Sequence, residues 1–469
     1  MNPRSIACGV VAVALAGCAA VGPDYKRPAL DLPGNYPDAP RTEAAPGLDA
    51  QWWKLYRDPA LDSLVASALE RNADVRMAVA RIEEADANLR EAGAAFLPEI
   101  DLGTTGSRSR ISSQTATPLP PGTATVRNNV RLTASTAFEL DFWGRLRRAL
   151  EAARAQALAS HYAKDVVTLT LAGLTSQAYF SLRSLEAQVA VARETLATRD
   201  ETLDMVRKRA QGGIASGLEV SQAEIARADA ATQLKDLQRQ RSLAEHQLGT
   251  LTGRLDLALP ASSNALLSLP TPPTPRTGLP SALLERRPDI RQAEQQLVSA
   301  NAQIGVARAA MLPTISLTGS YGGESQALAR LLESGSRIWS IGFGLTLPVF
   351  DWGRLAARSD AAEARARQAL AAYQKAAETA FREVADALTN VEQAAASERD
   401  LQDRAASARN ALRLARLRYE AGYSAYLEVL DAQRSANEAE LAVVRNRQTR
   451  LSASVDLMKA LGGGWNPQQ

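Results

Sequence analysis

The sequence contains one long pattern twice, and this internal duplication restricts the possible folds more than any other feature. Residues 68–102 match residues 283–317 at an offset of 215 positions. Residues 142–146 (FWGRL) match residues 351–355 (DWGRL) at an offset of 209 positions. Both offsets are far longer than the period of about 20 to 50 residues that solenoid repeats show. We therefore predict a duplicated domain, in which each element of the fold is present in two versions.

Both copies show the same order of elements. A third match, between 209–223 and 418–432, also has the offset 209, so the first copy carries six additional residues between Ile100 and Gly144. Each copy predicts a helix of about 35 residues that ends at a proline, then two segments of alternating polarity and a long helix. A glycine-containing break and a last helix follow. Proline ends the first helix because it disfavours helical geometry in the residue before it.

The duplication divides the chain into six predicted segments. They are a signal peptide (1–17), a lipidated and extended N-terminal segment (18–59), the first repeat (60–254), a proline-rich linker (255–280), the second repeat (281–462) and a C-terminal tail (463–469). The prolines between residues 259 and 280 exclude a helix there. We expect this stretch and residues 19–59 to be connectors laid along the outside of the structure.

The alternating segments predict strands with one apolar and one polar face. Apolar residues occupy even positions in 128–141 and odd positions in 338–349, whereas 99–106 and 314–321 alternate more weakly. A period of two is typical of strands. One interpretation is a soluble sheet on a hydrophobic core. The other is a membrane β-barrel, which the small number of apolar elements elsewhere in each repeat favours.

Four strands per chain are too few to close a membrane barrel, because the smallest such barrels have about eight. An open edge in lipid would leave backbone N–H and C=O groups unpaired, which costs several kcal/mol for each group. The barrel must therefore be shared between chains. Two chains would supply eight strands and three would supply twelve, and the alternation favours neither number.

The long helices predict a structure that extends well beyond a globular core. Residues 145–211 contain no proline and one internal glycine, Gly173, so one helix over this range would be about 100 Å long. Apolar residues in this helix, and in 401–419, recur at steps of three and four, which is coiled-coil spacing. The pattern is interrupted at Arg199. We predict a wall of paired helices that extends the barrel into the periplasm.

The N-terminus resembles a bacterial lipoprotein signal. The apolar run 6–16 is shorter than the about 20 residues of a transmembrane helix and fits a signal peptide. It ends in LAGC, which resembles a lipobox, and in proteins with that box the mature N-terminal cysteine, here Cys18, carries a diacylglycerol and an N-acyl chain. Ala19 in place of aspartate points to the outer membrane, by resemblance to sorted lipoproteins. The alternative is an ordinary signal peptide with a chance cysteine.

The composition argues against several classes of function. A net charge of +3 gives no nucleic-acid footprint. His161 and His246 lie alone in helical sequence, without the partners that a zinc or catalytic site needs. Cys8 and Cys18 are the only cysteines, and the first would leave with the signal peptide, so we expect no disulfide within the mature chain. We therefore expect no enzyme, no metal and no cofactor apart from the lipid on Cys18.

Four motifs together resemble the TolC/OprM family of outer-membrane efflux and secretion channels. They are LAGCAAVGPDYKRP (15–28), the LPEI/LPTI pair, the FWGRL/DWGRL pair and YLEVLDAQRSANEAEL (426–441). The resemblance covers nearly the whole mature chain, and Cys18 with VGPDYKRP is similar to the lipoprotein branch that works with resistance–nodulation–division pumps. It implies an α+β fold in which a trimer forms a twelve-stranded transmembrane β-barrel continuous with a twelve-helix periplasmic tunnel. A periplasmic adaptor and an inner-membrane pump are the implied partners of this outer-membrane duct for drugs or other small molecules.

The resemblance also places functional residues at the two glycine-containing breaks. The implied periplasmic gate consists of Asp431, Glu428, Tyr419, Glu219 and Gln222. The implied adaptor-contact tips contain Gly213, Ser216, Gly422 and Ser424. Three copies of Asp431 around a narrow pore would repel one another and would favour a bound cation. The other interpretation of these carboxylates is an ordinary solvated helix face.

The tip departs from the family pattern at one position. Ser424 stands where some family members carry an arginine, so a latch between a tyrosine, an arginine and an aspartate is incomplete here. Arg418 could substitute for that arginine if its side chain reached the lumen.

Two other functions are compatible with the sequence. A periplasmic coiled-coil adaptor lipoprotein also has a lipid anchor and a long helical hairpin, although adaptors usually have one hairpin flanked by β-rich lipoyl-like domains. Within the family, a type I protein-secretion duct or a metal-efflux duct would share the same motifs, because the pump selects the cargo.

Overall fold

The duplicated sequence does not fold as one compact unit per copy. The computed structural model describes residues 20–30, 33, 49–112, 114, 120, 122–260, 265–268 and 283–465. The chain forms two compact units, and each takes residues from both copies. The first includes 82–159 and 293–373 and contains the sheet, and the second includes 160–292 and 374–469 and contains the largest core.

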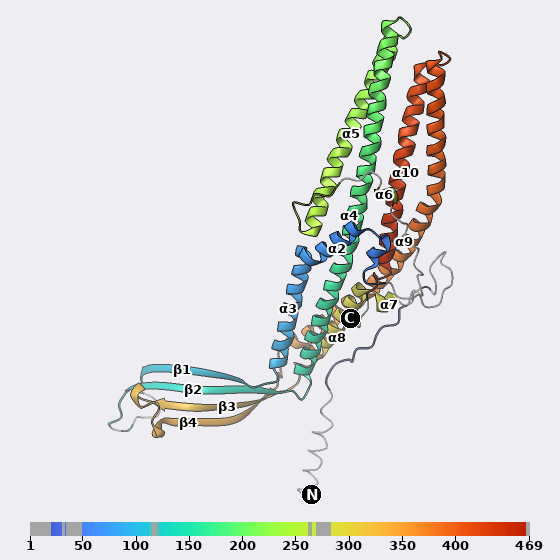
Figure 1. Cartoon of the computed structure of the whole chain (residues 1–469). Helices are drawn as coiled ribbons and strands as arrows, with labels where there is room; N and C mark the ends of the chain where they lie inside the picture. Colours follow the sequence, from blue (N-terminus) through green and yellow to red (C-terminus); the bar gives the residue numbers. More distant parts are fainter. Residues whose placement is uncertain are drawn as a thin grey trace. The chain divides into compact units, whose positions relative to one another are not determined.

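The four alternating segments form one antiparallel sheet in the order β1-β2-β3-β4 (Figure 1). Its strands are β1 (Glu99–Arg110), β2 (Val126–Leu140), β3 (Thr314–Ser325) and β4 (Arg337–Thr346). The prediction of four strands per chain is confirmed. β1 and β3 each run four residues beyond the range in which alternation is visible. The alternation is lost there because the second halves of both strands are rich in glycine, serine and threonine.

The duplication extends to the hydrogen-bond register of the sheet. In the first hairpin Glu99 lies opposite Ala137, and in the second hairpin Thr314 lies opposite Thr346. The two pairs are related by the offsets 215 and 209 that the sequence shows. The register is therefore a property of the repeated unit, as expected where turn geometry and side-chain alternation both fix it.

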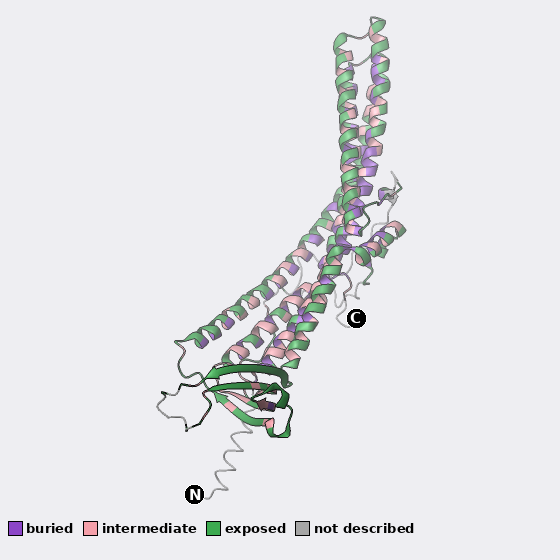
Figure 2. Cartoon of the chain, turned by 90° about the vertical axis from the view of Figure 1, so that its left-hand side faces the viewer, coloured by how far each residue is buried: buried purple, intermediate pink, exposed green. Residues whose placement is uncertain are grey.

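One face of the sheet is apolar and uncovered. Ile100 and Leu102 of β1 and Trp339, Ile341 and Phe343 of β4 are all exposed large apolar side chains. Figure 2 shows the same exposure along the strands of the sheet. An exposed apolar face of this size marks an interface with lipid or with another protein.

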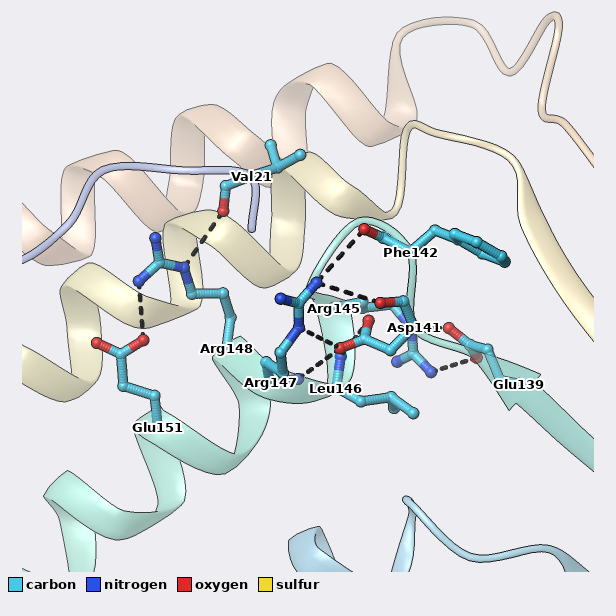
Figure 3. Close-up of polar contacts among 9 residues, drawn as sticks. All are labelled: Val21, Glu139, Asp141, Phe142, Arg145, Leu146, Arg147, Arg148 and Glu151. Carbon is cyan, nitrogen blue, oxygen red and sulfur yellow. Dashed lines mark hydrogen bonds and ion pairs between the residues drawn. The ribbon is translucent and has the colours of Figure 1, made fainter. Parts of the chain in front are cut away.

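Carboxylates organise the junction between β2 and α4 (Arg145–Gln211), which Figure 3 shows. Asp141 accepts hydrogen bonds from the backbone N–H groups of Leu146 (3.1 Å) and Arg147 (3.0 Å). These N–H groups have no partner within the helix, and a carboxylate at a helix N-terminus satisfies them. Glu139 accepts two hydrogen bonds from the Arg145 guanidinium, at 2.8 and 2.6 Å. The end of β2 is thereby fixed to the first turn of α4.

The long helices agree with the sequence-based expectation. α4 covers Arg145–Gln211 and its counterpart α9 covers Arg354–Glu420, each followed by a shorter helix, α5 (Gly217–Thr252) or α10 (Tyr426–Ala460). Within the described ranges, none of the helices has a stretch long and apolar enough to cross a membrane.

The first helix of each copy is broken, which corrects the prediction of one helix of about 35 residues. In the first copy α2 (Pro59–Arg71) and α3 (Ala73–Ala94) are separated at Asn72, whose side chain bonds the Leu251 carbonyl oxygen (3.0 Å) and the Asp74 N–H (2.7 Å). In the second copy α7 (Leu283–Arg286) and α8 (Pro288–Ala309) are separated at Arg287. Arg287 precedes a proline, which disfavours helical geometry at that residue.

The expectation that residues 19–59 lie along the outside is wrong at the end of this segment. The short helix η1 (Trp52–Tyr56) places Trp52 and Tyr56 in the centre of the largest hydrophobic core, against Phe180. The Tyr56 hydroxyl lies 2.6 Å from the Ser454 hydroxyl. The expectation of no helix in 259–280 is also wrong at α6 (Ala265–Ser268).

Residues 20–30 are extended and attached along the first unit. The Val21 N–H donates to the Trp143 carbonyl oxygen (2.9 Å), and Arg27 makes a two-pronged ion pair with Glu294 of α8 (2.6 and 2.8 Å). A Cβ atom on Gly305 would lie 2.6 Å from the Val21 carbonyl oxygen, so only glycine permits this approach. Nearer the junction, Arg148 contacts the Val21 carbonyl oxygen (Figure 3).

We predict that Asp58→Ala lowers the free energy of unfolding by about 2–4 kcal/mol. Asp58 caps α2 and also accepts a short hydrogen bond from Tyr179 (2.5 Å), whose pKa is raised to about 12 by burial and, secondarily, by that carboxylate. Thermal unfolding followed by circular dichroism measures the change. The control Asp74→Ala removes an exposed first-turn carboxylate and should cost only about 0.5 kcal/mol. Equal effects of the two variants would contradict the assignment.

Candidate functional site

The two helical tips end in the same type of turn. Gly213 and Gly422 have φ angles of 74° and 79°, a region that favours glycine. The Gly422 N–H donates to the Tyr419 carbonyl oxygen and the Tyr423 N–H donates to the Arg418 carbonyl oxygen, at 3.0 and 2.8 Å. This is a Schellman motif, which satisfies the last carbonyl groups of a helix. The tip between α4 and α5 repeats it around Gly213.

The tips differ in how the following helix begins. Ser216 accepts a hydrogen bond from the Glu219 N–H (3.3 Å) and caps α5. Ala425 takes the corresponding place before α10, without a side-chain cap. Ser424 is partly buried, and its hydroxyl has no hydrogen-bond partner among the described residues. Of the four predicted tip residues, Ser424 is the one with an unused polar group.

Tyr419 does not lie on the surface of the tip. Its side chain is 4% exposed and packs against the ring of Tyr426, with centroids 5.5 Å apart. The guanidinium of Arg209 lies 4.7 Å from the centre of the Tyr419 ring. Leu203 and Val206 of α4 belong to the same cluster. The two helical hairpins, α4–α5 and α9–α10, therefore share one small core near their tips. Tyr419 therefore joins the hairpins to each other in the single chain.

The predicted gate acids lie in different environments. Asp431 is exposed and pairs with Arg434 one turn along α10 (2.8 Å), and Glu428 lies 3.7 Å from Arg418. Glu219 is partly buried, and its charge, after the larger effect of burial, raises the pKa of the Tyr419 phenol. The structure thus places one predicted acid beside the buried tyrosine and two on the exposed surface of α10.

A groove beside α5 and α10 brings two of the predicted residues together. Gln222 and Asp431 both line it, together with Arg434 of α10. Arg199 of α4 also lines this groove, although it is only 8% exposed. Arg199 donates a hydrogen bond to Gln433, and burial lowers its pKa.

Sequence reasoning did not include Arg199 or Arg209 among the candidate residues. The interruption of the coiled-coil pattern at residue 199 was the available signal for the first, because a charged residue in an apolar ladder needs a partner. No signal pointed to Arg209, whose partner Tyr419 comes from the other copy. Cys18 lies outside the described residues, and within the described part of the chain no group of three or more His, Cys, Asp or Glu residues could hold a metal ion.

Comparison with known proteins agrees with this geometry. The family model described as outer membrane efflux protein matches residues 64–254 and 279–463. The outer membrane protein OprJ of Pseudomonas aeruginosa is 38% identical over 99% of this chain and 97% of its own length. The toluene efflux pump outer membrane protein TtgF of Pseudomonas putida is 36% identical over 97% of this chain and 96% of its own length.

A solved structure shows the same fold. The open state of the Neisseria gonorrhoeae MtrE outer membrane channel is 33% identical, with a TM-score of 0.83 over 96% of this chain and 99% of the MtrE chain. The similarity therefore includes the sheet, the long helices and the tips.

We predict that Gly422→Ala destabilises the tip locally by about 1–2 kcal/mol, because the left-handed conformation is unfavourable for residues with a Cβ atom. Hydrogen exchange of the amides around Tyr419 should become about 5 to 30 times faster. The control is Gly217→Ala, since Gly217 also has open space around it but lies in the first turn of α5 without a positive φ. Unchanged exchange in Gly422→Ala would show that the turn does not depend on glycine.

Proposed function

Because the chain belongs to the outer membrane efflux protein family, we propose that it forms the outer-membrane duct of a tripartite efflux system. In this proposal three copies form a passive channel that receives small molecules from an inner-membrane pump through a periplasmic adaptor. The chain itself supplies a path and a gate, and performs no chemical step.

The uncovered apolar face of the sheet is the observation that carries this proposal. Its exposed side chains, such as Ile341 and Phe343, would be unfavourable in water by about 25 cal/mol for each Å² of apolar surface. Lipid removes that cost, provided that the edges β1 and β4 are also paired. Three copies give twelve strands, which is an even number compatible with a closed membrane barrel. The adaptor alternative offers no reason for such a face.

The tips are the proposed contact with the adaptor. Gly213, Ser216, Gly422 and Ser424 lie in the two turns, where loop residues are free to meet a partner. The exposed apolar residues Ile214 and Tyr423 lie beside the glycines and supply contact area. The Ser424 hydroxyl oxygen is buried without a hydrogen-bond partner among the described residues, so it would meet the adaptor only if the turn rearranged.

The proposed gate has two parts, which are a set of polar side chains on α5 and α10 and the buried core around Tyr419. Asp431 and Glu428, each beside an arginine, form the charged lining that narrows when the α10 helices approach one another. Gln222 lines the groove that contains Asp431. Tyr419 and Glu219 act indirectly, since they hold the α9–α10 hairpin against α4 and α5. Movement of one hairpin against the other therefore has to disturb the Tyr419 core.

The cargo is proposed to be drugs, solvents or other small molecules. The name of TtgF assigns toluene efflux to that relative. A duct of this kind does not select its cargo, so the pump that feeds it determines what passes.

We predict that Asp431→Ala raises the single-channel conductance of trimers in planar bilayers and lowers their preference for cations. The substitution removes three carboxylates from the narrowest part of the pore, which leaves more space and less negative charge. Asp403→Ala, on the exposed surface of α9, should leave both quantities unchanged. A conductance equal to that of the unmodified protein would argue against the gate assignment, whereas absence of any channel would argue against the duct.

We predict that deletion of the chain makes its host more sensitive to the cargo of the pump, and that the unmodified chain restores resistance. An insensitive deletion strain would refute the efflux function.

We also propose that Cys18 carries the diacylglycerol and the N-acyl chain. Cys18→Ala should abolish incorporation of labelled fatty acid, but should retain much of the resistance, because one acyl anchor adds little to a membrane-embedded barrel. Labelled lipid in Cys18→Ala would refute the lipidation site.

A further inference from the structure

The bond between the two copies inside one chain shows how neighbouring chains can meet. The indole N–H of Trp143, at the end of the first hairpin, donates to the carbonyl oxygen of Pro313 just before β3 (2.7 Å). Next to this bond, β2 pairs with β3, and Leu140 lies opposite Ile315. At this end of the sheet the first copy and the second copy are thus joined by a strand pair and one indole hydrogen bond.

The duplication provides the same parts a second time, but on opposite edges of the sheet. Trp352 corresponds to Trp143 by the offset 209, and Pro98 corresponds to Pro313 by the offset 215. Trp352 is 89% exposed, and its φ angle of 56° is unusual for a residue other than glycine. Pro98 is exposed as well. In a single chain these two residues belong to the free edges β4 and β1, so they can meet only between chains.

We infer that β4 of one chain pairs with β1 of the next in a register that the duplication specifies. The register places Val349 opposite Ile100 and Leu347 opposite Leu102 of the neighbouring chain. At the end of this seam the Trp352 indole donates to the Pro98 carbonyl oxygen of the neighbouring chain. This inference rests on the proposed trimeric duct and adds the residue contacts that close it.

The end of β4 supports this register independently. β2 continues to Leu140, and its last three residues pair only with β3, because its pairing with β1 ends at Ala137. β4 ends at Thr346, the counterpart of Ala137, which is three residues before the counterpart of the last residue of β2. Residues 347–349 thus lack the strand that their counterparts have in β3. In the inferred seam β1 of the neighbouring chain supplies it.

The polarity of the two edges also agrees with this register. Residues directly opposite each other in an antiparallel pair point to the same face. Val349 and Ile100 are both exposed and apolar, at 86% and 74%, and Leu347 and Leu102 continue the match. A shift by one residue would place the apolar side chains of the two edges on opposite faces of the barrel. A shift by two residues would preserve the faces, so the test has to separate these two cases.

Repeated in one direction, the seam closes a ring. Each chain gives its β4 edge to one neighbour and its β1 edge to the other, which is a head-to-tail interface that closes when the rotation permits. Both unpaired rows of backbone groups are then used, and no edge remains in lipid. The exposed indole of Trp352 is covered at the same time.

Paired serine-to-cysteine substitutions test the register. Ser340 on β4 should lie opposite Ser109 of the neighbouring chain; their counterparts, Arg131 and Glu324, lie opposite each other inside one chain and form an ion pair at 4.0 Å. Opposite residues in antiparallel strands have Cα atoms about 4.5–5.5 Å apart, which suits a disulfide, whereas diagonal residues are about 7–8 Å apart. The variant Ser340→Cys with Ser109→Cys should form covalent dimers and trimers on mild oxidation of the full-length protein in detergent.

The matched control is Ser340→Cys with Ser107→Cys, which introduces the same side chains on the same face but two residues out of register. It should yield no covalent oligomer. Cross-linking of the control in place of the test pair would overturn the register. Native mass measurement before oxidation separates this outcome from failure of the duct: trimers without the Ser340–Ser109 link refute the seam alone, and monomers throughout refute the trimeric duct.

Trp352→Phe tests the end of the seam without removing the aromatic ring. Loss of one hydrogen bond should make exchange of subunits between tagged and untagged trimers about five times faster. Trp143→Phe is the control, since it breaks the corresponding bond inside one chain and should leave subunit exchange close to that of the unmodified protein. An exchange rate in Trp352→Phe equal to that of Trp143→Phe would remove Trp352 from the seam.

Discussion

Backbone hydrogen bonds at the two free edges of the sheet are the constraint on which the structure depends. The strand order β1-β2-β3-β4 leaves one row of N–H and C=O groups unpaired on β1 and another on β4. In water such rows would be solvated, but the apolar side chains beside them are suited to lipid, where no solvent can replace a lost partner. A single chain therefore leaves the backbone groups of β1 and β4 without partners in lipid. Assembly with other chains is needed to supply the missing hydrogen bonds.

The duplication provides a nearly repeated edge, and small departures from repetition distinguish the contact inside a chain from the contact between chains. Trp143 is partly buried and bonded, whereas Trp352 is exposed. The capping carboxylate is Asp141 before Phe142 in the first copy, but in the second copy Asp351 follows Phe350 and accepts from the N–H groups of Gly353 and Leu355. Val21, in the segment 20–30, bonds the first junction at the Trp143 carbonyl oxygen. One sequence unit thus serves two different interfaces.

The sequence predicts regular, repetitive parts of this fold well and its interruptions poorly. Period-two alternation identifies the strands, and the absence of proline from 145–211 identifies α4. The helix break at Asn72 depends on a carbonyl partner distant in sequence, Leu251, so no local pattern reveals it. The burial of Trp52 has the same cause. The break at Arg287 has a local signal in Pro288, although the Ala460 carbonyl oxygen that Arg287 also binds lies far away in the sequence. At the candidate gate, resemblance selects Tyr419 by position, but its burial follows from packing against Val206 and Arg209, which belong to the other copy.

The attachment of residues 20–30 to α8 has a consequence for the lipid. If Cys18 is acylated as proposed, only Ala19 separates it from Ala20, the first residue of the attached segment. An extended chain spans at most about 3.6 Å per residue, so the acyl group has a tether of roughly 7 Å from that point. A tether this short keeps the acyl group close to the strand–helix junction. The lipid therefore fixes the depth of that junction relative to the headgroups, and it does so in each subunit before the edge strands pair with a neighbour.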